Sequence, residues 1–318
     1  MNSYRIGIDL GGTKIEIAAF DQNNIPIFHK RVPTPKNNYN QTIAAIAHLI
    51  NECQQALGPA DSIGIGTPGA ESLVTGLMKN CNSICLNAKP LKKDLQDRLK
   101  RPIKLANDAD CFALSEAVDG AGAVLAGGHH ANTTKLITEP LLVFGVIIGT
   151  GVGGGLVYNK KLLQGPNRIT GEWGHNPLPF VQALKADCDI NRPRPCYCGK
   201  QGCIETYLSG SAIAADFHFL TGLTLTAENI VLLAAEGDLK AEAVLRFYIN
   251  NLARALASII NILDPHIIVL GGGLSNIQHL YTAVPLEWSR YVFSDDVRTL
   301  LVPARHGDTS GVRGAACL

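Results

Sequence analysis

The sequence lacks a net charge of either sign. Its 28 Lys and Arg residues nearly balance 27 Asp and Glu residues, which gives a formal charge of +1. Since nucleic acids and anionic membranes attract proteins largely through an excess of positive charge, this balance argues against both as partners. Charged residues make up 17% of the chain and hydrophobic residues 46%, a composition typical of a soluble globular protein.

Segments for targeting or membrane insertion are also missing. No apolar run reaches the roughly 20 residues that a membrane-spanning helix needs. The N-terminus, MNSYRIGIDLGG, leads into an expected strand without the features of a signal peptide. The nine cysteines are an odd number, and without a secretion signal they favour a reducing compartment. We therefore expect a cytoplasmic protein in which clustered cysteines bind metal rather than each other.

Two glycine-centred segments predict a duplicated α/β architecture. Residues 4–27 (YRIGIDLGGTKIEIAAFDQNNIPI) and 143–165 (VFGVIIGTGVGGGLVYNKKLLQG) both fit a strand, a glycine turn and a second strand. Their repetition half a chain apart indicates two similar domains facing each other, and a cleft between such domains is a favoured place for a ligand. On the pattern alone, two unrelated hairpins are the alternative.

Apolar periodicity predicts helices over residues 42–57 and 238–263. Residues 121–138 (AGAVLAGGHHANTTKLIT) are small, polar and aperiodic, and predict a surface loop. The histidine pair inside that segment, His129 and His130, has no Cys or acidic neighbour at ligand spacing, so a solvated loop is favoured over a metal site.

The predicted domain boundaries follow from these elements. We place an N-terminal α/β domain at residues 1–118 and a C-terminal α/β domain at 119–307. We expect a C-terminal helix at about 308–318 to pack back on the first domain.

Three glycine-rich turns each follow an apolar strand, at residues 9–14, 149–155 and 271–273. Glycine lets the backbone approach a polyanion closely, and successive N–H groups can cradle phosphate. One such turn could simply close a hairpin, but three favour a nucleotide. The sequence matches neither G-x-x-x-x-G-K-[ST] nor a dinucleotide-binding turn with its ribose-binding acid. Asp9 could position Mg²⁺, or its bound water, on the phosphates.

Two polar segments carry candidate catalytic and binding groups. In LANDAD (105–110), Asp108 and Asp110 are candidates for the carboxylate base of a phosphoryl transfer. An Asn-Asp pair before a helix is also an ordinary N-cap, which is the structural alternative. In GEWGHNPLP (171–179), Glu172 and His175 could bond adjacent hydroxyls of a polyol, or could be incidental polar groups of a turn.

The segment PCYCGKQGCIE (195–205) has the spacing C-x-C-x4-C. A disulfide between Cys196 and Cys198 would be strained, whereas three thiolates and one further ligand satisfy tetrahedral Zn²⁺. The fourth ligand could be His175 or Cys188, and free structural cysteines are the alternative to a metal. A four-coordinate zinc would be structural rather than catalytic.

Together these segments resemble the ROK family of sugar kinases, in the actin/hexokinase-like superfamily. The matching segments follow the family's order over essentially the whole chain: IGIDLGGTK, GIGTPGA, NDADCFALSEA, IIGTGVGGGLV, GEWGHNPLP, CYCGKQGCIET and ILDPHIIVLGGGLS. The resemblance implies two actin/hexokinase-like (ribonuclease H-like) α/β domains flanking a cleft, and ATP-dependent phosphorylation of the 6-hydroxyl of a hexose. Two features depart from the family: Asp110 stands where Asn is common, and residues 121–138 are longer than usual.

The resemblance also implies roles for individual residues. It makes Asp108 the catalytic base and favours His175 over Cys188 as the fourth metal ligand. The implied sugar-binding residues are Asn107, Glu172, His175, Glu205, Pro68 and Gly69. The implied ATP and Mg²⁺ residues are Asp9, Gly11, Gly12, Thr13, Lys14, Gly149, Thr150, Gly151, Gly271, Gly272 and Gly273. The implied Zn²⁺ ligands are His175, Cys196, Cys198 and Cys203.

Within the family, the cysteine segment and the KNCNSICLN and GEWGHNPLP segments look most like bacterial fructokinases of the fructo/mannokinase branch. We therefore expect D-fructose as substrate, with mannose as a second candidate; N-acetylglucosamine kinase and glucokinase are the alternatives. The family's transcriptional repressors carry a helix-turn-helix before the first glycine turn, whereas only eight residues precede Asp9 here. A non-catalytic sugar-binding regulator would normally lack the base, which is present. The oligomeric state is open, with a homodimer as one candidate.

Overall fold

The computed structural model describes residues 3–126, 140–179 and 194–318, and its internal contacts separate two compact units. Unit 1 comprises Met1–Leu141, Gly155–Gly171 and Arg305–Leu318, and unit 2 comprises Leu142–Gly154 and Glu172–Ala304. This division differs from the predicted boundary after residue 118, because the described residues among 119–141, and residues 155–171, also belong to unit 1.

Unit 1 is built on a mixed five-stranded sheet in the order β3-β2-β1-β4-β7. Strands β1, β2 and β3 pair antiparallel, whereas β1, β4 and β7 run parallel. A small hairpin of β5 and β6 follows β4. The strand bounds are β1 Tyr4–Leu10, β2 Lys14–Asp21, β3 Pro26–Pro33, β4 Ser62–Thr67, β5 Ala70–Glu71, β6 Met78–Lys79 and β7 Lys104–Asn107.

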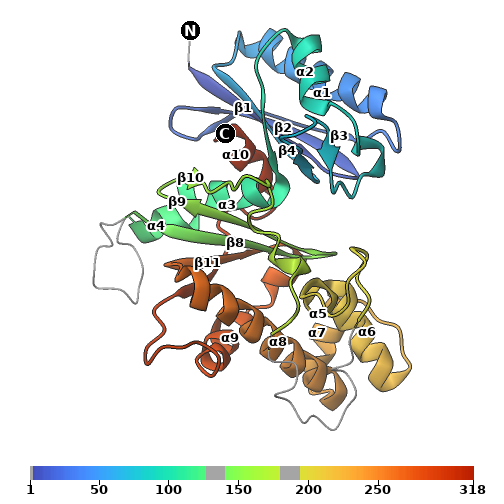
Figure 1. Cartoon of the computed structure of the whole chain (residues 1–318), viewed down its shortest axis with the longest axis vertical. Helices are drawn as coiled ribbons and strands as arrows, with labels where there is room; N and C mark the ends of the chain where they lie inside the picture. The colour runs from blue at the N-terminus through green and yellow to red at the C-terminus, as the bar shows by residue number, and fades with distance from the viewer. Residues whose placement is uncertain (1–2, 127–139, 180–193) are drawn as a thin grey trace. The chain divides into compact units, whose positions relative to one another are not determined.

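The two faces of this sheet carry different side chains because successive residues of a strand alternate. Ile6, Ile8 and Leu10 of β1 enter the main hydrophobic core together with residues of α1 and α2. On the opposite face, α10 passes so close to Gly7 that no side chain would fit there, since an added Cβ would lie 2.0 Å from Val312 O. Helices α1 and α2 and helix α10 therefore lie on opposite sides of the sheet (Figure 1).

Two helices of unit 1, α1 and α3, begin at asparagine residues that cap them. Asn38 accepts a hydrogen bond from Gln41 N at the start of α1, and Asn107 accepts one from Ala109 N at the start of α3. The predicted loop 121–138 begins instead with a short helix, α4, and its remaining residues from 127 lie outside the described part of the chain. The bounds are α1 Tyr39–Leu57, η1 Ile84–Leu86, α2 Leu91–Leu99, α3 Asp108–Val118, α4 Ala121–Ala126, η6 Gly307–Thr309 and α10 Ser310–Ala316.

The second five-stranded sheet has the order β10-β9-β8-β11-β12. Strands β8, β11 and β12 run parallel, and β9 and β10 are antiparallel. Numbered along the chain, both sheets follow one pattern, third-second-first-fourth-fifth, so the predicted duplication within an α/β fold is confirmed. The bounds are β8 Leu142–Ile148, β9 Val152–Tyr158, β10 Lys161–Leu162, β11 Ile267–Gly271 and β12 Leu300–Pro303.

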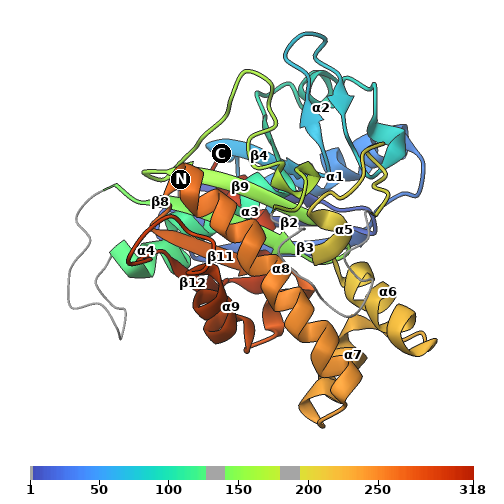
Figure 2. The same ribbon diagram turned by 60° about the horizontal axis from the view of Figure 1, so that its bottom comes forward.

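Helix α8 is the central helix of unit 2. It is capped by Asp238, which accepts a hydrogen bond from Ala241 N, and is buried almost continuously from Phe247 to Ala257. It lies across one face of the sheet with α9 beside it (Figure 2). The bounds in this unit are η2 Trp173–His175, α5 Glu205–Leu208, α6 Gly210–Thr221, α7 Ala227–Ala235, α8 Leu239–Leu263, η5 Gly273–Asn276 and α9 Leu280–Trp288.

No helix in the described ranges combines the length and apolar character that crossing a membrane requires.

Candidate functional site

The first glycine turn joins β1 to β2 in unit 1. Gly11 N donates to Lys14 O at 3.0 Å, which closes the turn, and Gly12 and Thr13 are exposed at its tip. Asp9, just before the turn, lies close to the start of α10, where a Cβ on Gly311 would be 3.0 Å from its Oδ2. The turn thus offers free backbone to a ligand beside a carboxylate.

Burial raises the pKa of Asp9 to about 6, and the nearby carboxylates of Asp108 and Glu16 add to this effect. Three acidic groups therefore gather at the end of β1. A divalent cation beside Asp9 would relieve their mutual repulsion, so the residues present fit the predicted Mg²⁺.

Asn107 and Asp108 mark the junction of β7 and α3. Asn107 is the N-cap of α3, as the sequence analysis allowed for an Asn-Asp pair before a helix. Asp108 is the first helical residue and its carboxylate is exposed, although its Oδ1 also accepts from Ala109 N at 2.8 Å. Asp110 is 8% exposed. Of the two candidate bases, Asp108 is the more exposed, whereas Asp110 lines the small cavity that Gly69 and Asn107 also line.

Pro68 and Gly69 directly follow β4. A Cβ on Gly69 would lie 2.5 Å from Lys79 O and 2.6 Å from Cys81 Sγ, so only glycine fits without rearrangement. Gly69 and Asn107 line one small cavity of about 30 Å³. The structure therefore brings together two of the predicted sugar-binding residues of unit 1.

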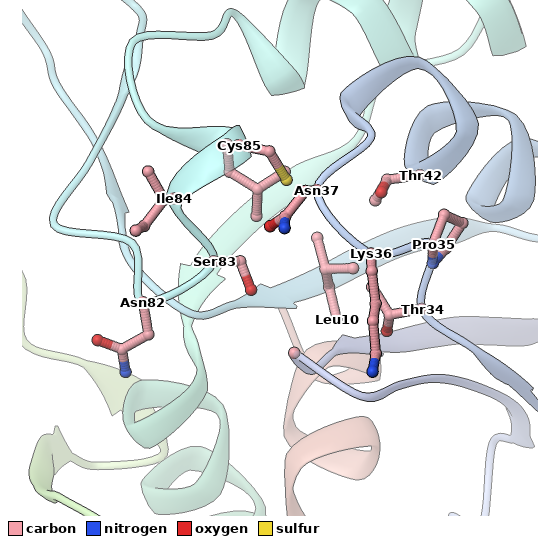
Figure 3. A pocket seen from close by; sticks show the side chains of 12 residues that line it. Leu10, Thr34, Pro35, Lys36, Asn37, Thr42, Asn82, Ser83, Ile84 and Cys85 are labelled. Carbon is pink, nitrogen blue, oxygen red and sulfur yellow. The ribbon is translucent and has the colours of Figure 1, made fainter.

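A larger cavity of about 280 Å³ lies next to Gly12 (Figure 3). Residues 34–37, after β3, face residues 82–85 across it. Its side chains are mostly polar or small, and Lys36 is the one charged residue in the lining. Residues 34–37 had no predicted role, and residues 82–85 entered the sequence analysis only as part of KNCNSICLN, one of the segments that look like bacterial fructokinases.

The second glycine turn, Gly149–Gly151, joins β8 to β9 in unit 2. Gly149 N donates to Gly151 O at 3.0 Å, and Gly149 O accepts from Gly210 N at 2.8 Å. The third turn, Gly271–Gly273, backs onto it: Gly272 has φ +81°, and a Cβ there would lie 2.5 Å from Ile148 O. Gly272 therefore requires glycine, whereas a Cβ on Gly149 would meet nothing closer than 4.0 Å.

A cavity of about 760 Å³ opens beside these turns. Its size suits a nucleoside, and its lining includes Gly149, Thr150 and Gly273 among the predicted ATP residues. The remaining lining comes from α6, α7 and η5, which sequence reasoning missed because helix surfaces carry no glycine signature: Gly210, Ser211, Ala214, Thr226, Ala227, Glu228, Val231, Leu232, Leu274, Asn276 and Ile277.

Glu205 begins α5 and is tied to the second glycine turn. Its Oε2 accepts from Val152 N at 2.9 Å, and a Cβ on Gly151 would lie only 2.6 Å from the same oxygen. Gly151 is therefore needed for the placement of Glu205. Glu172 lies at the start of η2, and its side chain is exposed.

His175, Cys196, Cys198 and Cys203 converge as the spacing predicted: one ligand atom from each lies within 4.8 Å of all the others. Cys198 Sγ is 3.7 Å from Cys203 Sγ, and Cys196 Sγ is 3.5 Å from His175 Nδ1. Zinc–sulfur bonds of about 2.3 Å at tetrahedral angles place two thiolates about 3.8 Å apart, so this set fits a tetrahedral metal. Cys188, the alternative ligand, lies outside the described residues.

Backbone hydrogen bonds hold the segment that carries His175 next to the segment that carries the three cysteines. Leu178 N donates to Gly202 O at 2.9 Å, and Ile204 N donates to Asn176 O at 2.8 Å. The backbone N–H of Lys200 lowers the pKa of Cys198, which favours the thiolate that a metal binds.

The second ring nitrogen of His175 is already engaged. Its Nε2 lies 3.0 Å from the Tyr197 hydroxyl, and the two rings meet edge to face. This contact orients Nδ1 toward Cys196, as outer partners of metal-binding histidines commonly do. Of the two roles predicted for His175, the arrangement therefore favours metal ligand over sugar contact.

The duplicated sheets, glycine turns and His–Cys cluster define a hexokinase-like fold with a candidate metal centre. A ROK hexokinase from Thermus thermophilus has the same fold, with a TM-score of 0.82 and 28% identity over 99% of this chain and 97% of that one. The glucokinase of Streptomyces griseus, solved with glucose and AMPPNP, shares the fold with a TM-score of 0.71 and 24% identity over 99% and 98% of the two chains.

The model of the ROK family matches residues 5–318, and this chain belongs to the ROK family. An N-acetyl-D-glucosamine kinase of Salmonella paratyphi B is 41% identical over 312 residues, 98% of each chain. The enzyme of the same name from Escherichia coli K12 is 39% identical over the same share. The predicted sugar kinase of the ROK family is confirmed.

The finer assignment to fructokinase is not supported, because these relatives are N-acetyl-D-glucosamine kinases. Trp173, one of the residues behind that assignment, has an exposed fraction of 3%. Its indole donates to Gly153 O, and its ring packs on Phe144 with centroids 5.7 Å apart. A side chain used for internal packing is a poor indicator of which sugar is bound.

Proposed function

We propose that this chain transfers the γ-phosphoryl group of ATP to the 6-hydroxyl of N-acetyl-D-glucosamine. The observation that carries this proposal is the 41% identity to an N-acetyl-D-glucosamine kinase over 98% of both chains. Glucokinase is the other alternative from the sequence analysis. Its support is weaker, because the glucokinase of Streptomyces griseus is only 24% identical to this chain.

In this mechanism, Asp108 accepts the proton of the sugar hydroxyl as the hydroxyl oxygen attacks phosphorus. Its exposure at the start of α3 supports this role, since a general base must reach the proton that it removes. Asn107 and Gly69, which share a cavity in unit 1, bind sugar hydroxyls together with Pro68. Glu172 and Glu205 provide the acceptors from unit 2.

The adenosine part of ATP lies in the 760 Å³ cavity beside Gly149 and Gly273. The backbone N–H groups of Gly12 and Thr13, at the exposed tip of the first turn, stabilise charge that develops on the transferred group. Asp9 would hold Mg²⁺, which when bound would neutralise phosphate charge. Positioning and charge stabilisation account for most of the acceleration in such reactions.

The zinc that His175, Cys196, Cys198 and Cys203 would hold has a structural role. The ligands come from the two segments that also carry Glu172 and Glu205. The cluster thereby fixes the positions of both carboxylates, and with them the shape of one side of the sugar pocket.

A coupled ADP-release assay with N-acetylglucosamine, glucose, mannose and fructose tests the proposal. We expect kcat/KM for N-acetylglucosamine to exceed that for each other hexose by at least about tenfold, which corresponds to about 1.4 kcal/mol of discrimination. A higher value for fructose or glucose would refute the choice of sugar while sparing the kinase. ADP release that no sugar stimulates would refute the kinase itself.

A further inference from the structure

A carboxylate buried in the sheet of unit 1 has no part in the mechanism above. Glu16, in β2, has an exposed fraction of 0%. Its Oε1 lies 2.9 Å from His29 Nε2 and 3.0 Å from Arg31 Nη2, and its Oε2 lies 2.7 Å from Arg31 Nε. Lys14 Nζ is 3.7 Å from Oε2. Three basic side chains thus converge on one acid.

Strand register places this cluster beside the first glycine turn. Asp9 of β1 is directly opposite Glu16, and Glu16 is directly opposite Arg31 of β3. Residues opposite one another on adjacent strands project from the same face of a sheet. Asp9, Glu16 and Arg31 therefore form a row across three strands, and Lys14, two residues before Glu16, shares their face.

At Glu16, a single negative charge lies close to more than one positive charge. One carboxylate faces Lys14 and Arg31, whose side chains are 43% and 41% exposed. Burial alone would raise the pKa of Glu16, but hydrogen bonds from Arg31 and His29 outweigh burial and lower it. Glu16 therefore stays ionised and holds the Lys14 and Arg31 side chains close together, next to the carboxylate of Asp9, against their mutual repulsion.

The geometry of Arg31 leaves one edge of its guanidinium available. The Nε–Nη2 edge faces Glu16, and Nη1 makes no hydrogen bond to any residue that the structure describes. The planar guanidinium carries five N–H donors, so it can bind a second anion while the first fixes its plane. The hydrogen bond from Arg31 to Glu16 raises the pKa of Arg31, and the negative charges of Asp308 and Asp9 lie near enough to contribute to this shift.

We propose that Arg31 and Lys14 bind the terminal phosphates of a nucleoside triphosphate held on the Gly11–Thr13 turn, and that Glu16 is the residue that positions them. This rests on the nucleotide part of the proposed function. Arg31 contacts the phosphate, whereas Glu16 acts through Arg31 and Lys14.

Equilibrium binding of two nucleotides, measured without sugar, tests the proposal. The probes are the Mg²⁺ complex of AMPPNP, a non-hydrolysable triphosphate, and AMP, which lacks the terminal phosphates. Loss of a charge-assisted hydrogen bond costs about 1.5–3 kcal/mol, so Arg31→Ala should weaken AMPPNP binding about tenfold or more. AMP binding should stay within about twofold of wild type.

Lys30→Ala is the matched control. Lys30 precedes Arg31 on β3, projects from the other face and pairs with Glu52 at 2.6 Å, so its loss should leave both affinities unchanged. Unaltered AMPPNP binding in Arg31→Ala would overturn the proposal. An equal loss of AMPPNP and AMP binding would do the same, because it would indicate a general structural defect.

Glu16→Gln, made in the wild type and in Arg31→Ala, tests the positioning role. It should weaken AMPPNP binding in the wild type and by a clearly smaller factor once Arg31 is absent, since the two side chains act as a unit. The same factor in both backgrounds would refute action through Arg31. Thermal unfolding identifies variants that fail to fold. If Glu16→Gln does not fold, the Arg31→Ala variant by itself still tests the proposal. Because no sugar is present, the result is independent of the hexose assay.

Discussion

The glycine turns of the two units have the same place in their sheets but different surroundings. In unit 1, the turn after β1 is flanked by Asp9 and Lys14, with Glu16 and Arg31 one and two strands away. In unit 2, the turn after β8 is Gly149–Gly151 and has no charged residue of its own. It instead donates Val152 N to Glu205 and borders a cavity of about 760 Å³.

This difference indicates that the two copies have taken on different tasks. The charged groups that would move a proton or bind terminal phosphates gather in unit 1, near Asp9 and Asp108. The cavity proposed for the nucleoside and the His–Cys cluster proposed to support the sugar pocket belong to unit 2. Variants of the charged groups of unit 1 should therefore change turnover and phosphate binding, whereas variants of the metal cluster and the Glu205 contact in unit 2 should change the affinity for sugar.

Asp108→Asn should have the largest effect. Asparagine retains the shape of the side chain but cannot accept a proton, and general bases contribute about 10²–10⁴-fold. We expect kcat to fall by that factor while N-acetylglucosamine binding, measured by calorimetry, stays within about threefold of wild type. Near-normal turnover would remove Asp108 from the role of base. The same change at the buried Asp110 serves as the positional control, because a larger loss there would identify Asp110 as the base.

Cys198→Ser should break the sugar-binding role assigned to unit 2. We expect metal analysis of the wild type to find one equivalent of zinc. Loss of one ligand should abolish this zinc and raise KM for N-acetylglucosamine about 10–100-fold. Binding of AMP should be unaffected, because the nucleoside cavity has no residue of the cluster in its lining. Cys317→Ser, a thiol of unit 1, should retain the zinc. Wild-type protein without stoichiometric zinc would contradict the assignment of this metal.

Much of the fold follows from local sequence signals. The apolar runs around the two glycine turns predicted β1, β2, β8 and β9, and the helix predicted at 238–263 is observed at Leu239–Leu263 with Asp238 as its cap. These elements are long or end at strong stop signals. The division into units was less predictable, because residues 155–171 belong to unit 1 through contacts with residues that lie far away in the chain.

The candidate site was predictable only where its residues lie in short motifs. The C-x-C-x4-C spacing indicated the metal cluster, but Tyr197, which orients His175, gave no signal of its own. Glu16 and Arg31 were missed because their pairing depends on strand register. A bulge between Ala19 and Phe20 shifts the register of β2 and β3, and a sequence pattern does not specify where such a shift occurs.

Gly151→Ala separates the two possible roles of the second glycine turn. The added Cβ would lie 2.6 Å from Glu205 Oε2, so the carboxylate must move. Since a small misplacement of a binding group weakens its contacts, KM for N-acetylglucosamine should rise by about tenfold. A rise confined to KM for ATP would instead mean that the turn serves only the nucleotide. Gly165→Ala, whose Cβ would be an ordinary 3.6 Å from Thr170 Oγ1, is the control.

Asp119→Asn should have the smallest effect and should change stability alone. Asp119, at the end of α3, lies 3.1 Å from His306 Nε2 and 2.9 Å from Arg313 Nη1, which ties the C-terminal segment into unit 1. Burial would raise the pKa of Asp119, but the hydrogen bond from His306 and the charge of Arg313 together lower it. The ionised carboxylate therefore stabilises the folded state above pH about 4, and this contribution is lost as the pH falls through the depressed pKa.

We expect the variant to lose about 2 kcal/mol of unfolding free energy at pH 7, measured by urea denaturation, with KM values unchanged. The difference from wild type should persist at pH 5 and shrink as the pH is lowered from 4 toward 3. A difference that grows on acidification would contradict the assigned ion pairs. Asp97→Asn removes an exposed partner of Lys93 on α2, and it should leave stability unchanged because solvent screens that pair. A change in KM on loss of Asp119 would instead mean that the C-terminal segment helps to position the charged groups of unit 1.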